Sequence, residues 1–318
     1  MQILITGASG FVGTNLINYF SPIVDTEIDV LDLGQKVYER VVSNYHWDEL
    51  DFVPMDLYDD VIHLAGKAHD TRNKSRREVY FEINLGLTKR IFDRFLNSKA
   101  RNFIYFSSVK AAADVVKGGI LTEDVIPSPV GPYGESKLMA EEYLMDFIKK
   151  QDDRLKHKNV YILRPCMIHG PGNKGNLNLL YGVVNKGIPW PLGAFNNHRS
   201  FTSIDNLCFI IQKLINSDIP SGIYNIADDE PVSTNRLIEL ISEVIGSKSK
   251  IINVNPRFIK GMSRFGDFFH LPINSLRLQK LTENYIVSNE KIKSALGLDK
   301  LPISAEGGFK TTLKSFNQ

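Results

Sequence analysis

The strongest constraint on the fold is a glycine-rich turn near the amino terminus. The apolar run at residues 3–5 leads into residues 6–13, Thr-Gly-Ala-Ser-Gly-Phe-Val-Gly, and an amphipathic segment continues through Phe20. Glycines at this spacing permit a tight turn and close approach of the backbone to a ligand before a helix begins. The N–H groups and positive dipole end of that helix suit a pyrophosphate without a basic side chain. We therefore expect a dinucleotide to contact Gly7, Gly10, Phe11, Val12 and Gly13, although a glycine-rich turn alone could simply join a strand to a helix.

A carboxylate about 20 residues further on indicates which dinucleotide binds. Asp32 lies at the end of an expected strand, residues 28–33. Its side chain can accept both adenosine ribose hydroxyls and would repel a 2′-phosphate, so NAD is favoured over NADP. Asp29 is a rival that we expect to be a solvated edge residue, and Lys36 could weaken the preference.

Short apolar runs alternate with amphipathic segments through the first half of the chain. The runs lie at residues 3–5, 28–33, 61–65, 103–106 and 160–163. This alternation predicts right-handed crossovers and a doubly wound, Rossmann-type α/β fold with a parallel sheet. Two apolar stripes at helical spacing are expected to cover that sheet, or alternatively to share in a helical dimer interface. They are Leu87, Ile91 and Phe95 in the first segment, and Met139, Tyr143 and Phe147 in the second.

Proline and glycine break the alternation after residue 163, which indicates a smaller, loop-rich α/β lobe. A later run at residues 222–227 looks like another core strand, so the two lobes should interleave in sequence. We expect residues 1–165 and about 199–228 to form the NAD-binding domain. Residues 166–198 and 229–318 should form the substrate lobe.

Composition narrows the function classes. The 38 Lys and Arg against 36 Asp and Glu give a net charge of only +2, which argues against broad capture of nucleic acid or anionic membrane. Cys166 and Cys208 match neither a disulfide framework nor a zinc pattern, and no metal is predicted. The sequence shows no basic leader and no run long enough to span a bilayer, so we expect a cytoplasmic protein.

A tyrosine and a lysine one helical turn apart suggest acid–base chemistry. Tyr133 and Lys137 would share a helix face, and the ammonium charge would lower the tyrosine pKa toward the working pH. Upstream, Ser107 and Ser108 end an expected strand at the carboxyl edge of the sheet, where open α/β folds bind ligands. The tyrosine could then exchange a proton with a sugar hydroxyl while hydride moves to or from nicotinamide.

Several of these features together resemble the extended short-chain dehydrogenase/reductases. They are Gly7, Gly10 and Gly13, Leu64-Ala65-Gly66, Ser107-Ser108, Tyr133 with Lys137, and Arg164-Pro165. Over nearly the whole chain their order is similar to that of the NAD-dependent epimerase/dehydratase family, in its nucleotide-sugar 4-epimerase and 4-ketoreductase branch.

The resemblance implies roles for individual residues. Ser108 would orient the sugar oxygen, Tyr133 would be the acid/base, and Lys137 would hold the nicotinamide ribose. Leu64, Ala65, Gly66 and Pro165 would contact the cofactor. Asn84 could position the lysine or could cap a helix.

Two departures from the family pattern matter. Val109 and Lys110 follow Ser108 where dehydratases usually carry Asp and Glu, so 4,6-dehydration is disfavoured. Residues 43–47 also do not cleanly match the adenine-contacting Asp-Leu pair of the family. Asp56-Leu57 could serve instead.

Residues 170–177, 191–193 and 198–201 resemble the UDP-holding part of this branch. Arg199 can grip a diphosphate through its planar fork, and Arg277 could add a second charge. Asn176 can donate to phosphate or uracil, and Leu177 belongs to the same run. His63 is expected in the core, whereas His69 could face the sugar. Residues 257–269 mix basic and aromatic side chains, and a substrate-lobe helix is favoured over a membrane-facing surface there.

The resulting hypothesis is hydride transfer at C4 of a UDP-sugar, either as a 4-epimerase or as a 4-ketoreductase of a 4-keto-6-deoxy sugar. Both would use one active site, and a homodimer through the helices that flank the sheet is expected. The alternative is a non-catalytic dinucleotide-binding sensor or regulatory protein on the same fold.

Overall fold

A computed structural model describes residues 1–34, 38, 40–68, 75–116, 119–150, 152–173, 175–248, 250–268 and 274–317. Lys36 and His69 lie outside these ranges. None of the helices that it describes has both the length and the hydropathy needed to cross a bilayer.

The centre of the molecule is a seven-stranded parallel sheet with the order β10-β7-β5-β4-β1-β2-β3. The strands are β1 (Gln2–Thr6), β2 (Glu27–Asp32), β3 (Ser43–His46), β4 (Asp60–His63), β5 (Asn102–Phe106), β7 (Asn159–Pro165) and β10 (Gly222–Ile226). From β1 the strands follow one another outward to β3 on one side, and the chain then crosses to β4 and continues outward to β10 on the other side. This reversal between β1 and β4 opens a crevice at their carboxyl ends, which is the ligand site of doubly wound sheets. The predicted Rossmann-type fold is confirmed.

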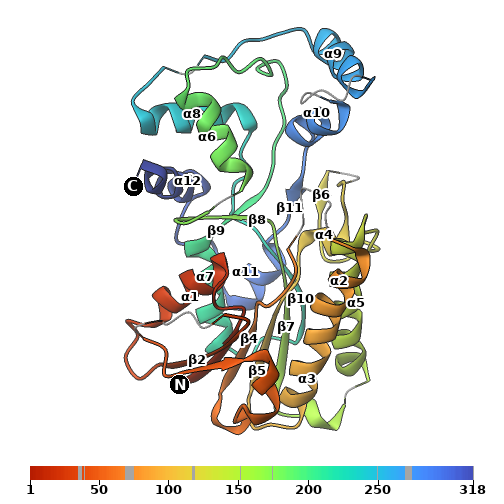
Figure 1. Ribbon diagram of the computed structural model, residues 1–318, viewed down its shortest axis with the longest axis vertical. Coiled ribbons are helices and arrows are strands. Elements are labelled where there is room, and N and C mark those ends of the chain that lie inside the picture. Colours follow the sequence, from red (N-terminus) through yellow and green to blue (C-terminus); the bar gives the residue numbers. More distant parts are fainter. Residues whose placement is uncertain are drawn as a thin grey trace.

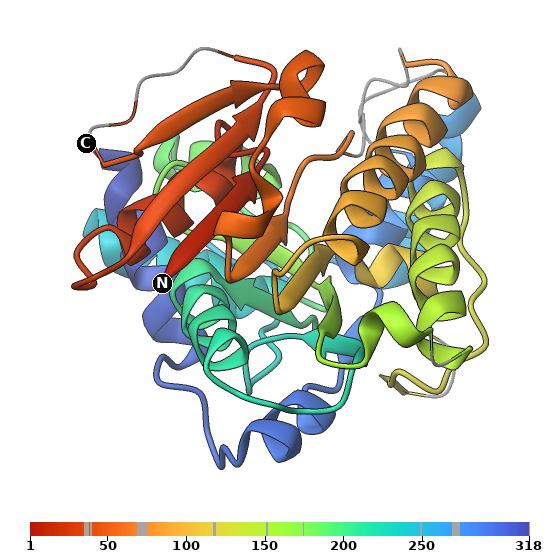
Figure 2. The same ribbon diagram turned by 90° about the horizontal axis from the view of Figure 1, so that it is seen from below.

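Helices cover both faces of this sheet (Figure 2). One face carries α1 (Phe11–Phe20), α7 (Ile204–Ile215) and α11 (Glu290–Leu296), and the other carries α3 (Thr88–Leu96) and α5 (Pro132–Lys149). Each face has its own apolar core. Leu16, Leu207 and Ile292 pack on the first face, and Ile91 and Leu144 on the second. The packing of α11 against β10 shows that the end of the chain returns to the sheet.

A second lobe lies beyond the carboxyl ends of the strands (Figure 1). It consists of α6 (Asn176–Asn185), α8 (Thr234–Ile245), α9 (Pro256–Phe268), α10 (Ser275–Thr282) and α12 (Ala305–Lys314) around a separate apolar core. Two short parallel pairs lie between the lobes, β8 (Met167–His169) with β9 (Phe201–Ser203), and β6 (Ile120–Leu121) with β11 (Ile286–Val287). The remaining elements are α2 (Arg77–Phe81), the π-helix η3 (Glu82–Leu87), α4 (Val109–Ala112), and the 3-10 turns η1 (Trp47–Phe52), η2 (Met55–Leu57), η4 (Asp153–Leu155) and η5 (Ser315–Asn317).

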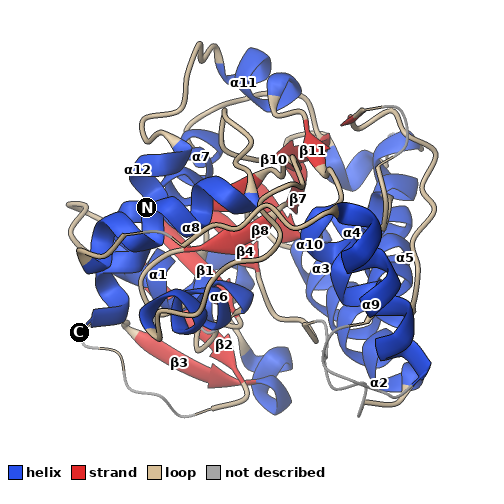
Figure 3. Cartoon of the chain, turned by 90° about the horizontal axis from the view of Figure 1, so that it is seen from above, coloured by secondary structure: helices blue, strands red, loops and turns tan. Residues whose placement is uncertain are grey.

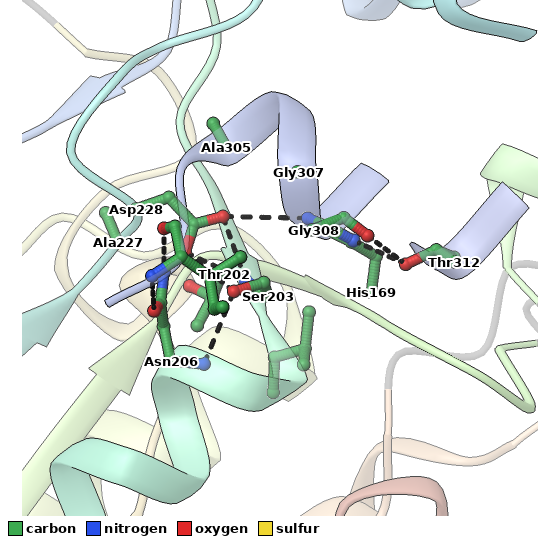
Figure 4. A network of polar contacts seen from close by, with 12 residues as sticks. His169, Thr202, Ser203, Asn206, Ala227, Asp228, Ala305, Gly307, Gly308 and Thr312 are labelled. Carbon is green, nitrogen blue, oxygen red and sulfur yellow. Dashed lines mark hydrogen bonds and ion pairs between the residues drawn. The ribbon is translucent and has the colours of Figure 1, made fainter. Parts of the chain in front are cut away.

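A buried polar network joins the second lobe to the sheet (Figure 4). His169 at the end of β8 stacks on Phe309 of α12, with ring centroids 4.0 Å apart and planes 6° from parallel. Its Nδ1 lies 2.9 Å from Thr312 Oγ1, and its Nε2 lies 3.6 Å from the carboxylate of Asp228, which follows β10. That carboxylate also accepts the Ser203 N–H at 3.0 Å. These contacts fix α12 against the carboxyl end of the sheet, so the two lobes meet through a defined junction.

Two sequence predictions about the sheet and its helices were wrong in part. The edge strand β3 was missed because Ser-Asn-Tyr-His is polar and none of its four residues is fully buried. The α5 stripe does not face the sheet throughout, because Met139 is 44% exposed. The fully buried side of α5 instead includes Lys137, Ala140, Glu141 and Leu144, so charged side chains occupy the position expected for apolar ones.

Candidate active site

The glycine turn leaves no room for side chains where β1 meets α1. Gly7 has φ +72°, and a Cβ there would lie 2.7 Å from the backbone nitrogen of Ala65 in the loop after β4. A Cβ on Gly13 would lie 2.6 Å from the Cα of Ala8. Gly10 precedes α1 without a side-chain cap, so the first-turn N–H groups meet no competing side-chain acceptor there. This cradle at the β1–β4 crevice fits the pyrophosphate of a dinucleotide.

Asp32 ends β2 beside this turn and is only 6% exposed. Its carboxylate accepts the Ser9 N–H at 2.5 Å and the Leu33 N–H at 2.7 Å, and these bonds fix the carboxylate beside the glycine turn. Each carboxylate oxygen has a further lone pair for a ribose hydroxyl. The rival Asp29 is not a solvated residue, because it accepts the Ser43 N–H and the Tyr58 hydroxyl at 2.8 and 2.7 Å.

The loop after β4 brings the cofactor cradle against α5. A Cβ on Gly66 would lie 2.9 Å from Asn84 Oδ1 and 3.0 Å from Lys137 Nζ. Asn84 is fully buried, accepts the Lys67 N–H at 2.7 Å and donates to Ser136 Oγ at 2.9 Å. It lies inside the π-helix η3, so the helix-cap alternative is wrong. Its amide instead clamps the β4 loop to the start of α5.

Two other expected cofactor residues lie at the start of α1 beside the cradle, and a third ends β7 further along the sheet. Phe11 and Val12 open α1 and are half-buried, whereas Pro165 ends β7 and is buried. A Cβ on Gly170 would lie 3.4 Å from Phe11 Cζ, so the start of α1 abuts the segment after β8. Their contacts with a cofactor stay a prediction.

Ser108, Tyr133 and Lys137 come together at the carboxyl end of β5. Ser108 is 8% exposed and caps α4, where its Oγ accepts the Lys110 N–H at 3.2 Å. Burial raises the pKa of Tyr133, while a hydrogen bond with Ser108 lowers it by less. The hydroxyls of the serine and the tyrosine are therefore partners.

Lys137 is almost fully buried beneath this pair. Its Nζ donates to the carbonyl of Phe106 at 2.6 Å and lies 4.9 Å from the ring centroid of Tyr105. Burial lowers the pKa of Lys137 to about 8, and the nearby Glu141 opposes this shift. The expected lowering of the tyrosine pKa by Lys137 is not found, because burial of the phenol dominates and the pKa of Tyr133 is raised.

A buried ion pair below Lys137 was missed by sequence reasoning. Glu141 and Arg164 are each 1% exposed, and the guanidinium donates to the carboxylate at 2.6, 3.0 and 3.1 Å. Ser107 Oγ donates to the same carboxylate. The pair ties α5 to the ends of β5 and β7. A sequence signal existed, because Glu141 lies one turn after Lys137 on the same helix face.

Arg199, the expected diphosphate ligand, already has partners within the chain. It donates to the carbonyl of Lys280 on α10 and lies 3.8 Å from the carboxylate of Glu283. Its guanidinium also lies 5.8 Å from the ring centroid of Tyr285, whose hydroxyl donates to the Ala113 carbonyl at 2.7 Å. A chain of contacts therefore connects Arg199 with the segment that begins at Ser108.

The other expected substrate residues lie in the second lobe. Leu177 packs in the core of that lobe and is 6% exposed. Asn176 begins α6 and Arg277 lies on α10, but their side chains are outside the described part of the chain. His63 is a core residue as predicted, since it is fully buried between Thr6 and Thr88 and burial lowers its pKa to about 3.

Asp56, the proposed adenine-contacting alternative, accepts the Lys99 N–H at 3.0 Å and lies in η2. The next residue, Leu57, is 57% exposed.

The parallel sheet, the glycine cradle at its crevice and the Ser-Tyr-Lys cluster beside it define a dinucleotide-dependent enzyme of the extended short-chain dehydrogenase/reductase type. Residues 3–227 match the model of the NAD dependent epimerase/dehydratase family, and the chain belongs to this family.

Curated relatives extend the match over the whole chain. UDP-glucose 4-epimerase of Vibrio cholerae is 30% identical over 329 aligned residues that cover 100% of this chain and 96% of that protein. N-acetyl-α-D-glucosaminyl-diphospho-ditrans,octacis-undecaprenol 4-epimerase of Escherichia coli O157:H7 is 28% identical, covering 78% of this chain and 73% of that protein. The solved UDP-glucose 4-epimerase of Thermus thermophilus, a complex with NAD, has a TM-score of 0.73 at 19% identity and covers 100% and 99% of the two chains. The protein is thus an NAD-dependent nucleotide-sugar epimerase/oxidoreductase, and the alternative of a non-catalytic sensor is set aside.

Proposed function

We propose that this enzyme transfers hydride at C4 of a UDP-sugar, with Tyr133 as the acid/base. The observation that supports this most is the Ser108–Tyr133 pair, which lies above the buried Lys137 and next to the Gly7–Ala65 cradle. A nicotinamide bound there would supply or accept the hydride, and Tyr133 would donate or accept the proton. The reaction class is either 4-epimerisation or reduction of a 4-keto sugar.

The raised pKa of Tyr133 supports a role as proton donor in the resting enzyme. The phenol is protonated at neutral pH, so it can donate a proton to a carbonyl oxygen at C4. Ser108 would hold the same oxygen, because its hydroxyl can donate and accept at once. Oxidation of a C4 hydroxyl requires the phenolate, and a positive charge close to the phenol would lower its pKa.

Lys137 would contribute by holding the ribose next to the nicotinamide. Its ammonium retains two N–H donors after bonding the Phe106 carbonyl, and it lies beside Gly66 at the cradle. A ribose hydroxyl in this space could accept a hydrogen bond from Lys137 and would contact the backbone at Gly66, and these two contacts would define its position.

The environment of Ser108 argues against 4,6-dehydration. Val109 packs in an apolar cluster, and Lys110 Nζ bonds the Asp114 carboxylate at 2.8 Å. Elimination needs an acid and a base at these two positions. Neither side chain can serve as a carboxylic acid there.

The choice of a UDP-sugar rests on the second lobe and on the relatives. Arg199 and Arg277 would face the diphosphate, and Asn176 would donate to the phosphate or the uracil, with Leu177 next to it in the same run. The two relatives named above have names that state 4-epimerisation of a sugar carried on a diphosphate. The guanidinium of Arg199 lies 3.8 Å from the carboxylate of Glu283, and binding of a phosphate would place a second anion beside it.

NAD is proposed as the cofactor because of Asp32. Its buried carboxylate at the end of β2 would face the 2′ position of the adenosine ribose, where a phosphate would be repelled. Dimerisation through the helices that flank the sheet, the two-lobe boundaries and a cytoplasmic location stay predictions.

The proposed function is tested by incubating the purified enzyme with UDP-N-acetylglucosamine, UDP-galactose and a UDP-4-keto-6-deoxy sugar, with and without NADH or NADPH. Turnover without added reductant identifies a 4-epimerase. Reductant consumption only with the keto sugar identifies a 4-ketoreductase. Absence of C4 chemistry on all three sugars, with NAD bound, would refute the proposal.

A further inference from the structure

Helix α9 lies at the far end of the second lobe (Figure 1) and carries exposed apolar side chains. Phe258, Met262 and Phe265 are 62%, 46% and 61% exposed. Their spacing of four and three residues places them on one side of the helix. Ile259 and Ser263, which are 7% and 2% exposed, attach α9 to the lobe by a different side. The apolar face is therefore not the face that packs into the lobe.

The segment that contains α9 is strongly basic although the whole chain is almost neutral. Residues 246–268 contain five basic side chains and one acidic one. The basic residues are Lys248, Lys250, Arg257, Lys260 and Arg264, and all five are exposed. The single acid, Asp267, accepts the N–H and the hydroxyl of Ser275, at 2.9 and 2.5 Å. The net charge of +2 for the chain thus conceals a local excess of positive charge at one end.

This combination of side chains favours one kind of occupant. A second copy of the chain would meet the patch with the same patch, because a two-fold interface is self-complementary, and that would bring the basic side chains face to face. An anionic lipid surface satisfies both properties at once, since apolar and aromatic side chains enter the headgroup region and Lys and Arg contact the phosphates.

We propose that α9 docks this enzyme onto the surface of an anionic lipid bilayer. Its apolar face would enter the bilayer surface, and its basic residues Arg257, Lys260 and Arg264 would contact the lipid phosphates. The α9 end projects away from the sheet, and in Figure 3, which looks onto this end, α9 lies in front of α5. The enzyme would then lie with its second lobe toward the bilayer. Docking through α9 would not depend on which sugar the enzyme converts.

Vesicle binding by the full-length enzyme tests this proposal. We expect it to sediment with vesicles of phosphatidylcholine that contain phosphatidylglycerol, and not with phosphatidylcholine alone. Each basic residue near such a surface strengthens binding about fivefold, so the double change Lys260→Gln and Arg264→Gln should weaken it about 25-fold. High salt should weaken it as well.

The apolar contribution is tested with Phe258→Ser and Met262→Ser together. This variant should lose vesicle binding and keep its thermal melting curve. The matched control removes Phe52 and Leu57, which are 82% and 57% exposed in the other lobe, and it should bind as the wild type does. In a Phe258→Trp variant the indole emission should shift to the blue when anionic vesicles are added, because the natural Trp47 and Trp190 are already buried.

Three results would overturn the proposal. They are equal binding to both kinds of vesicle, unchanged binding by the α9 variants, and no binding at all. Conversion of a dimer to a monomer by the Phe258 and Met262 changes, without vesicle binding by the wild type, would identify the face as an interface between copies.

Discussion

Replacing Glu141 by glutamine should strongly destabilise the enzyme, because the change removes one charge of a buried pair and keeps the shape of the side chain. Arg164 and Glu141 are each 1% exposed and share three contacts of 2.6 to 3.1 Å. Removing one partner of such a pair leaves an uncompensated buried charge, which costs about 3–5 kcal/mol. We therefore expect the free energy of unfolding to fall by about 4 kcal/mol, measured by urea denaturation followed by circular dichroism.

The same helix provides a matched control. Asp146 pairs with Lys150 at 2.7 Å, but their side chains are 55% and 71% exposed. Asp146→Asn should therefore lose less than about 0.5 kcal/mol. The double variant Glu141→Leu and Arg164→Met should lose less than the sum of its single changes, because it removes both charges together. If Glu141→Gln and Asp146→Asn are equally stable, the assignment of a buried, energetically coupled pair is refuted.

Glu141 also acts on the active site through Lys137. Its carboxylate raises the pKa of that lysine against the effect of burial, so Glu141→Gln should move the lysine titration to lower pH. The pH dependence of NADH binding reports this shift, which a purely structural role of the ion pair would not produce. An unchanged titration would mean that the pair stabilises the fold without tuning the lysine.

Three further changes test the cofactor site. Gly7→Ala should abolish NADH fluorescence enhancement and destabilise the protein more than Gly246→Ala. Both glycines have positive φ, which costs about 1–2 kcal/mol for alanine. Of the two, only Gly7 has backbone atoms within 3 Å of the added Cβ. Equal losses of stability in the two variants would therefore contradict the close backbone approach at Gly7. Asp32→Asn should improve NADPH binding relative to NADH roughly tenfold, whereas Asp29→Asn should leave the ratio unchanged, and an unchanged ratio in both would show that Asp32 does not select the cofactor. The pKa of Lys137 is about 8 in the folded protein and 10.5 in the free side chain, so between these pH values the unfolded state binds more protons than the folded state. The free energy of unfolding of the wild type, compared with that of Lys137→Met, should therefore rise by about 3 kcal/mol as the pH increases from 8 to 10.5. A difference that does not change with pH would contradict the lowered pKa of Lys137.

The sequence predicted the elements whose signals are local. The strand–glycine–helix unit at residues 2–20 and the core strands β4, β5 and β7 each contain a short apolar run that marks them in the sequence, and all were found. The edge strand β3 carries no such pattern because it is half-exposed. Its existence depends on pairing with β2, as between Asp29 and Ser43, which no local signal in the sequence could reveal.

The candidate site was predicted in its residue types and only partly in its electrostatics. Tyr133 and Lys137 do lie close to Ser108, yet the proton affinity of the phenol is set mainly by burial, which depends on the folded environment. Glu141 and Arg164 were not expected in the core, because hydropathy assigns charged side chains to the surface unless their partner is known. Arg199 was predicted to grip a phosphate, and its contacts with residues more than 80 positions away could not be foreseen.

The most direct test of the proposed C4 chemistry is the turnover number of Tyr133→Phe on the UDP-sugar that the wild-type enzyme converts. We expect the turnover number to fall roughly 10²- to 10⁴-fold, because the substitution removes only the hydroxyl that exchanges a proton with the sugar oxygen. Binding of NADH should change little, which would show that the cofactor site is intact. Wild-type turnover by this variant would contradict the assignment of Tyr133 as the acid/base.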